Sequence, residues 1–349
     1  QNNDSDNYNI AIGHSACEVL TTGVQNTVIG ALAGDSLTTA TNNVAIGFEA
    51  LGTEDEHGFN VAVGHRALKT QNAGASAYST AVGYNAGLSV TTGVYNTILG
   101  GLAGDALTTG GSNVLLGFDA GGALVEGSDN IAIGAYALNA EDAHGRNVAI
   151  GHESLGTLNA GAHGYNTAVG YYSGQAMTTG VYNTVIGGLA GDALTTGSRN
   201  VAVGYNALST EDAHGRNTAV GYQCLTVQDA GVNAYNTAVG YHAGVAITTG
   251  IQNTLIGGLA GDALTTGTGN TAVGYQALTT EDGNGTATAI GQKALMLQNA
   301  GAESYNTAVG YDAGQQVTTG VRNTLVGALA GDALTTGSFN VAIGWGALS

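Results

Sequence analysis

The residues best suited to chemistry lie in a short acidic loop that contains a histidine. It reads EDAHG at residues 141–145 and again at residues 211–215. Carboxylate and imidazole groups at this spacing are potential metal ligands. Equivalent loops would lie roughly 19–24 Å apart at about 4.8 Å per stacked turn, too far to share an ion. A further copy has Asn284 in place of the histidine, so the pattern favours a solvated turn and no metal site is expected.

A second acidic motif resembles a calcium-binding repeat. The run GGLAGDALT at residues 187–195 approaches the nonapeptide that binds calcium in stacked turns. Ala190 stands where that repeat needs a glycine, and the motif is never repeated back to back. The stacked carboxylates that would enclose the ion are therefore missing, and we expect no cofactor.

The potential nucleophiles do not suggest an enzyme. Cys17 and Cys224 are the only cysteines, and they lie twelve repeats apart. That separation of roughly 58 Å far exceeds the roughly 7 Å that a disulfide can span. Cys224 occupies a position that is Ala or Ser in other repeats, so we interpret it as a small packing residue. No serine or histidine has a distinctive context, and we expect no catalytic residues.

The element that must position these residues is a repeat ending in Ile, Val or Leu followed by Gly. Its spacing is 17 or 19 residues, which suits one turn of a β-solenoid, expected to carry two short strands. The twenty closing glycines are Gly13, Gly30, Gly47, Gly64, Gly83, Gly100, Gly117, Gly134, Gly151, Gly170, Gly187, Gly204, Gly221, Gly240, Gly257, Gly274, Gly291, Gly310, Gly327 and Gly344.

A longer period is superimposed on the single turn. The spacings run 17, 17, 17 and 19, which makes a unit of 70 residues and four turns. Residues 118–134 form one extra copy, and a stack tolerates this because each turn contacts only its neighbours. We therefore predict an all-β fold, a parallel β-solenoid that runs as one continuous domain over residues 1–349.

Two positions in each turn are predicted to hold the stack together. The residue before the closing Gly is aliphatic in every copy, which predicts a buried core column that includes Ile150, Val169, Ile186, Val203 and Val220. The residue four before the Gly is Asn in eighteen copies. Stacked asparagines can hydrogen-bond along the stack, which predicts a structural ladder that includes Asn147, Asn166, Asn183, Asn200 and Asn217.

Two other positions are candidates for the surface. An aromatic residue often follows the closing Gly; a stacking ladder is favoured there over a recognition surface, for which the candidates are Tyr171, Tyr205, Tyr222 and Tyr241. Two residues before the Gly, the usual Ala is replaced once per unit by a bulky residue. Because that position should face away from the core column, we predict an interchain seam that includes Val28, Ile98, Val185, Leu255 and Leu325.

The repeat, as in NVAIG at residues 147–151, resembles the head repeats of trimeric autotransporter adhesins and related repeats in some phage tail-fibre proteins. The resemblance covers essentially the whole chain. It implies a left-handed parallel β-roll, a side-by-side homotrimer, and a role in surface attachment or host recognition through a cell-surface receptor or glycan. It also implies an extracellular location, as a cell-surface filament or virion appendage.

Composition limits the partners. The chain has no proline, 59 glycines and a net charge of −18. Proline would remove a hydrogen-bond donor from a continuous ladder, so its absence fits the solenoid. The negative charge opposes binding to nucleic acid and to anionic membranes, and no apolar run is long enough for membrane insertion. Copies of the chain itself are the expected partner.

The two ends of the chain suggest assembly. Joining Ser349 to Gln1 of another copy would complete a turn of 18 residues, which predicts head-to-tail stacking. We therefore expect a non-enzymatic extracellular fibre element of the adhesin-head or phage tail-fibre type. The alternative is a purely structural extracellular filament subunit. Threonine pairs such as Thr178 and Thr179 leave ice binding as a minor alternative.

Overall fold

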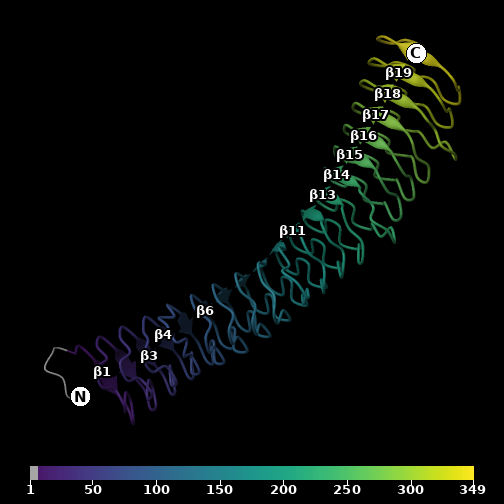
Figure 1. The fold of residues 1–349 in the computed structure, drawn as a ribbon. Coiled ribbons are helices and arrows are strands. Elements are labelled where there is room, and N and C mark those ends of the chain that lie inside the picture. Colours follow the sequence, from purple (N-terminus) through teal and green to yellow (C-terminus); the bar gives the residue numbers. More distant parts are fainter. Residues whose placement is uncertain (1–6) are drawn as a thin grey trace. The chain divides into compact units, whose positions relative to one another are not determined.

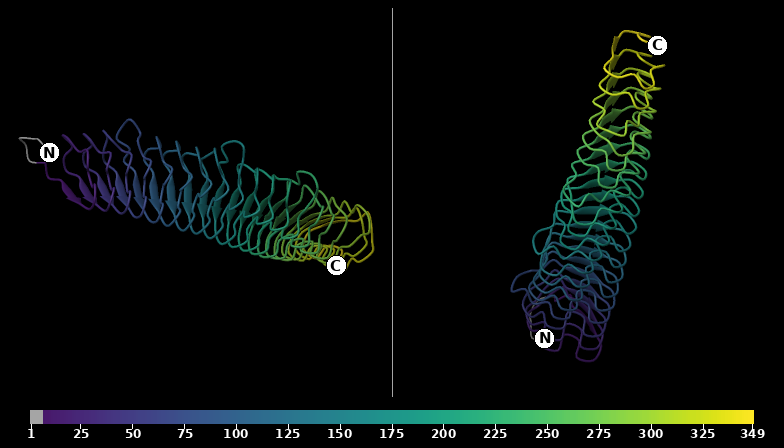
Figure 2. Two further views of the ribbon diagram at one scale, coloured as in Figure 1. Left: turned by 90° about the horizontal axis from the view of Figure 1, so that it is seen from below. Right: turned by 90° about the vertical axis from the view of Figure 1, so that its right-hand side faces the viewer.

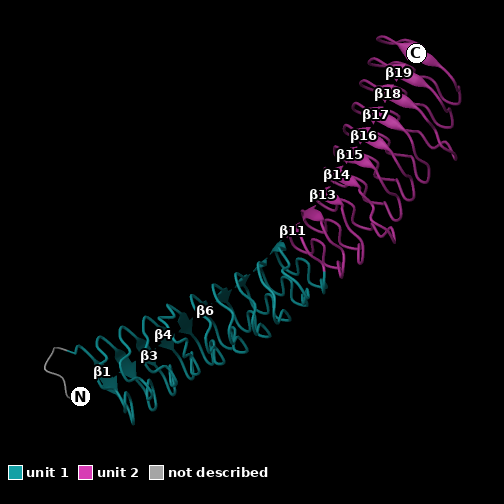
Figure 3. Cartoon of the chain, viewed as in Figure 1, with its two compact units in different colours: residues 1–179 teal, residues 180–349 magenta. Residues whose placement is uncertain are grey.

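The chain folds into two compact units, residues 1–179 and residues 180–349 (Figure 3). The computed structural model describes residues 7–349; residues 1–6, which belong to the expected head-to-tail junction, lie outside the described part. Each unit contains ten strands of three residues (Figure 1). Across residues 7–349 no helix is long and apolar enough to cross a membrane.

The strands recur at the interval set by the repeat. In the first unit they are β1 (Ile10–Ile12), β2 (Thr27–Ile29), β3 (Val44–Ile46), β4 (Val61–Val63), β5 (Thr80–Val82), β6 (Thr97–Leu99), β7 (Val114–Leu116), β8 (Ile131–Ile133), β9 (Val148–Ile150) and β10 (Thr167–Val169). In the second unit they are β11 (Thr184–Ile186), β12 (Val201–Val203), β13 (Thr218–Val220), β14 (Thr237–Val239), β15 (Thr254–Ile256), β16 (Thr271–Val273), β17 (Thr288–Ile290), β18 (Thr307–Val309), β19 (Thr324–Val326) and β20 (Val341–Ile343).

Within each unit, successive strands pair in parallel and in register. Ala202 of β12 lies opposite Ala219 of β13, for example. Strand β8, from the extra copy at residues 118–134, pairs with β7 and β9 like any other rung. The predicted all-β fold, a parallel β-solenoid of about twenty turns, is confirmed.

Each rung carries one strand rather than the expected two. The rest of the turn is irregular, but its backbone still bonds to the neighbouring rung: Gly191 N donates to Ala207 O at 2.9 Å, and Thr248 N to Thr265 O at 2.9 Å. Within each unit the strands gather on one side of the stack and the loops on the other (Figure 2). Rung-to-rung hydrogen bonds therefore extend around the turn and satisfy backbone groups outside the strands.

The closing glycine is required by the approach of adjacent rungs. Gly204 has a φ of +135°, and a Cβ placed on it would lie 2.3 Å from the carbonyl oxygen of Gly221. The same close contact recurs along the stack, as between Gly47 and Gly64. A side chain at this position would therefore both strain the backbone and push the rungs apart.

The predicted core column is wrong, because the strands present the opposite face to the interior. The middle residue of each strand from β2 to β19 is fully buried, usually as Ala. Among the residues assigned to the core column, Ile186 is 37% exposed, and the others, Ile150, Val169, Val203 and Val220, are only partly buried. Because side chains alternate along a strand, burying the middle residue turns both of its neighbours outward.

The predicted interchain seam is wrong for the same reason. All of its residues are 0% exposed and lie inside their own turns: Val28, Ile98, Val185, Leu255 and Leu325. Leu255 fills space left by glycines, since a Cβ on Gly244 or Gly261 would come within 2.8–2.9 Å of its methyl groups. Many of the rungs with Ala in the strand carry a buried Leu at the glycine position, such as Leu208. In these rungs and in that of Leu255, the large buried side chain comes from opposite walls of the interior.

The two cysteines are free. Cys224 is fully buried, with its Sγ 3.2 Å from the carbonyl oxygen of Ala238. Burial raises the pKa of its thiol to about 12. Its surroundings fit the interpretation of a small packing residue.

We predict that Gly204→Ala destabilises the chain by about 3 kcal/mol or more, because the added Cβ meets the Gly221 carbonyl at a strained φ. Gly231→Ala is the matched control, since Gly231 also has a positive φ, +66°, but nothing lies within 4 Å of the Cβ. Its cost should be about 1 kcal/mol. Denaturation followed by circular dichroism gives both values; equal costs would contradict the packing constraint.

We also predict that Leu255→Ala costs about 2–5 kcal/mol because it empties a fully buried site. The adjacent Ile256 is 40% exposed, so Ile256→Ala should cost about 1 kcal/mol or less in the isolated chain. The same denaturation measurement compares the two. A larger loss of stability in Ile256→Ala than in Leu255→Ala would show that the outward residue forms the core after all.

Candidate functional site

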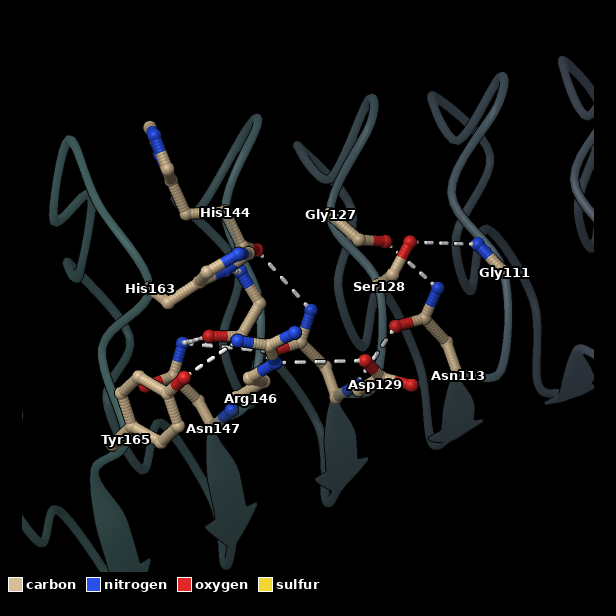
Figure 4. Close-up of polar contacts among 12 residues, drawn as sticks. Gly111, Asn113, Gly127, Ser128, Asp129, His144, Arg146, Asn147, His163 and Tyr165 are labelled. Carbon is tan, nitrogen blue, oxygen red and sulfur yellow. Dashed lines mark hydrogen bonds and ion pairs between the residues drawn. The ribbon is translucent and has the colours of Figure 1, made fainter.

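The asparagine ladder is present and is buried. The predicted members Asn147, Asn166, Asn183, Asn200 and Asn217 are at most 1% exposed. The backbone N–H of each rung donates to the side chain before it: Asn200 N to Asn183 Oδ1 at 2.9 Å, and Asn217 N to Asn200 Oδ1 at 3.0 Å. In the first unit the pattern includes Asn113 and Asn147 (Figure 4).

The side-chain amide nitrogens of the ladder donate hydrogen bonds to backbone carbonyls of the following rung. Asn183 Nδ2 donates to Gly197 O at 2.8 Å, and Asn113 Nδ2 donates to Gly127 O at 2.9 Å (Figure 4). Each asparagine thus ties its own rung to both neighbours through backbone groups. Such bonds satisfy polar groups that would otherwise be costly to bury.

Three of the four candidate recognition tyrosines, Tyr205, Tyr222 and Tyr241, form a stacked column. Ring centroids of Tyr205 and Tyr222 lie 5.6 Å apart at 18°, and those of Tyr222 and Tyr241 lie 5.6 Å apart at 11°. Tyr171 lies 4.1 Å from Tyr172 in a tilted arrangement. All four candidates are 45–55% exposed. Because neighbouring rings cover the faces within the stack, these tyrosines present mainly their edges and hydroxyls to the outside.

A second aromatic column is formed by the residues one place before the ladder asparagines. It was not predicted from the sequence. Phe59 and Tyr78 stack at 4.9 Å, and Arg216 lies over the ring of Tyr235 at 5.2 Å. In Figure 4 the guanidinium of Arg146 bonds to Tyr165 and pairs with Asp129. The signal that could have revealed this column is the aromatic residue or arginine that often stands one place before the ladder asparagine.

The glutamates of the acidic loops are buried, so the expected solvated turn is wrong for them. Glu54, Glu141 and Glu211 are 0% exposed, and each Oε1 accepts the backbone N–H three residues later, at 3.1–3.2 Å. They occupy a stack position that is Leu in the preceding rung, as at Leu194 before Glu211. Burial raises the pKa of both Glu54 and Glu211 to about 7.

A buried amide network continues from these glutamates. Gln298 Nε2 donates to Glu281 Oε2 at 3.0 Å, and Asn306 Nδ2 donates to Gln298 Oε1 at 2.8 Å. Asn236 bonds to Gln228 in the same way at 2.6 Å. In the rungs of Glu281, Gln298 and Asn306 the network therefore links the acidic loop to the asparagine ladder.

The histidines of these loops turn their rings toward the glutamates. His57 Nδ1 lies 3.8 Å from Glu54 Oε1, and the corresponding distances are 3.6 Å at His144 and 3.9 Å at His214. In all three loops a carboxylate oxygen of the Glu and of the following Asp and a ring nitrogen of the His lie within 4.8 Å of one another. This arrangement could hold a cation.

An open hollow lies beside the extra rung. Tyr136, Asn139, Glu153, Gly156 and Thr157 line it. Glu153 Oε2 accepts a hydrogen bond from Gln175 Nε2 at 2.7 Å, so this carboxylate is already engaged. No nucleophile paired with a base lines the hollow, which gives it no evident catalytic chemistry.

We predict that Glu54→Gln removes a pH dependence of stability. The folded pKa of Glu54 is about 7, above its ordinary value of 4.5, so its stabilising contribution is complete below pH 4.5 and is lost as the pH rises through 7. The variant should match the wild type near pH 4.5 and exceed it by roughly 1–2 kcal/mol at pH 8. Thermal unfolding in buffer with EDTA checks this. The exposed Glu56→Gln is the control; parallel curves for wild type and Glu54→Gln would refute the prediction.

The chain was compared with known proteins. No protein-family model matches the sequence, and a search of curated proteins found no matching relative. The resemblance to adhesin-head and tail-fibre repeats therefore rests on the repeat motif alone.

Proposed function

We propose that the chain is a non-enzymatic section of an extracellular fibre, of the adhesin-head or tail-fibre type, which acts in surface attachment or host recognition. Copies of the chain pack side by side in this fibre, with a trimer as the expected number. The observation that carries the proposal is an exposed strand face on each unit, where the outward residues of successive rungs are aliphatic residues, threonines and many tyrosines. The repeat motif described above supports the assignment to this class.

This strand face follows from side-chain alternation. In one rung Tyr235, Thr237, Val239 and Tyr241 point outward, while the residues between them face the interior or the glycine column. The tyrosines at the two edges are 49% and 55% exposed. Repeated along a unit, this arrangement makes an aliphatic stripe from the last residue of each strand. Beside it runs a column that is mostly threonine in the second unit, and aromatic residues recur at both edges.

The face is large enough for a stable interface. In the second unit eight tyrosines are 45–55% exposed: Tyr182, Tyr205, Tyr222, Tyr235, Tyr241, Tyr275, Tyr305 and Tyr311. With roughly 200 Å² for each ring system, they alone offer about 800 Å². A standard protein interface buries about 800 Å² per partner, so the strand face reaches that size before the aliphatic stripe is counted.

A second candidate is a structural filament subunit that recognises only copies of itself. The stacked tyrosines favour it, because the ring faces that would bind a sugar are covered by neighbouring rungs. Both candidates require self-association through the strand face. They differ in whether the assembled fibre also binds a foreign surface, which a binding assay with intact cells would separate.

We predict that the purified chain is a homo-oligomer and that Ile256→Asp combined with Ile290→Asp makes it monomeric. These residues are 40% and 38% exposed on the strand face, so burying two new charges there opposes assembly but leaves each turn intact. Val232→Asp is the control, because Val232 is 51% exposed in a loop. Sedimentation velocity gives the mass. A monomeric wild type, or an unchanged oligomer in the double variant, would refute the packing scheme.

A further inference from the structure

Three loops of the chain gather carboxylate and imidazole atoms outside the strand face. We call them the EDH loops; their members are Glu54, Asp55 and His57, then Glu141, Asp142 and His144, then Glu211, Asp212 and His214. In the third loop Asp229 of the next rung adds a fourth ligand atom within the same 4.8 Å. Figure 4 shows His144 on the loop side of its rung, away from the strands.

The spacing of the donor atoms suits a bound cation. The three Nδ1 to Oε1 distances of 3.6–3.9 Å are too long for hydrogen bonds. Two ligands of a tetrahedral ion with bonds of about 2.0–2.1 Å lie about 3.4 Å apart. A shift of a few tenths of an ångström would therefore bring both atoms into one coordination shell.

Buried atoms without partners provide an independent observation. The Nδ1 atoms of His57, His144 and His214 are all buried and make no hydrogen bond. Glu54 is 0% exposed, and its Oε2 is also buried and without a hydrogen-bond partner. Leaving a buried polar group unsatisfied is unfavourable, so the recurrence of the same unpartnered nitrogen in three loops indicates a ligand.

No protein cation fills this role among residues 7–349. Ion pairs of lysine and arginine there involve Glu49 and Asp129, neither of which belongs to an EDH loop. The carboxyl groups of the EDH loops thus have no lysine or arginine partner among residues 7–349.

We infer that each EDH loop binds a divalent transition-metal ion such as Zn²⁺, through its Glu, Asp and His Nδ1. Imidazole with carboxylate is a ligand set that Zn²⁺ accepts, whereas Ca²⁺ and Mg²⁺ prefer oxygen ligands alone. The loops lie too far apart along the stack for several of them to share one ion. The structure brings enough donors together within each single loop. This inference does not depend on the proposed fibre function.

The fourth loop of the series serves as an internal control. Glu281 Oε1 accepts the backbone N–H of Asn284 at 3.2 Å, just as in the EDH loops. The loop keeps the same glutamate and aspartate but has Asn284 in place of histidine. It should therefore bind no ion, and Asn284→His should create a new site on an existing backbone.

The test is calorimetric titration of the full chain with ZnCl₂ at pH 7.5, after removal of metals with EDTA. We expect three ions per chain, one for each EDH loop. His57→Asn, His144→Asn and His214→Asn should each remove one ion, and the triple variant should remove all three. Asn284→His should raise the number to four. Circular dichroism of each variant shows whether the fold persists.

His242→Asn is the matched control, because His242 lies outside the loops and its Nε2 bonds to Gln223 at 2.9 Å. It should leave the stoichiometry unchanged. The absence of Zn²⁺ binding would overturn the inference. The inference would also be overturned if the number of bound ions stayed the same in the three histidine variants and in Asn284→His, since the ions would then lie elsewhere. The gain of a site in Asn284→His keeps the test decisive even if a loss variant unfolds.

Discussion

The close approach of successive glycines is the constraint on which the rest of each unit depends. At Gly204 a Cβ would lie 2.3 Å from the next rung, so the spacing of the stack is set where no side chain intervenes. That spacing fixes the register of every parallel strand pair. It also brings equivalent side chains within contact of their copies, which makes asparagine and tyrosine columns possible. The columns are consequences of the stacking distance.

A narrow interior follows from the same geometry. The middle strand residue shares the core with residues of the opposite wall, and a large side chain on one wall is accommodated by small residues on the other. Ala with Leu and Leu with Gly are two solutions, as Ala202 with Leu208 and Leu255 with Gly261 illustrate. The periodic appearance of a large residue in the middle of the strand therefore reflects packing inside one chain. Its apolar residues are unavailable to a partner.

This arrangement determines what is left for function. Asparagines, middle strand residues and the glycine column are all engaged in the stack, whereas the outer strand residues and aromatic edges remain exposed. The loops lie on the other side, where buried glutamates and glutamines interrupt an otherwise aliphatic column. The strand face and the EDH loops are thus separate surfaces. A structural role for the first and cation binding by the second can coexist, because each depends on different residues.

The sequence by itself determined the repeat, the parallel solenoid, the glycine column, the extra rung and the asparagine ladder, since all of these follow from spacing and from residue types with narrow conformational or hydrogen-bonding needs. It could not decide which face of a three-residue strand is buried. Both Ala219 and Val220 are apolar, and only the space left by the opposite wall makes the smaller one the interior residue. The burial of Glu211 was hidden for a related reason: a glutamate in a turn looks solvated until the fold places it in a column of leucines.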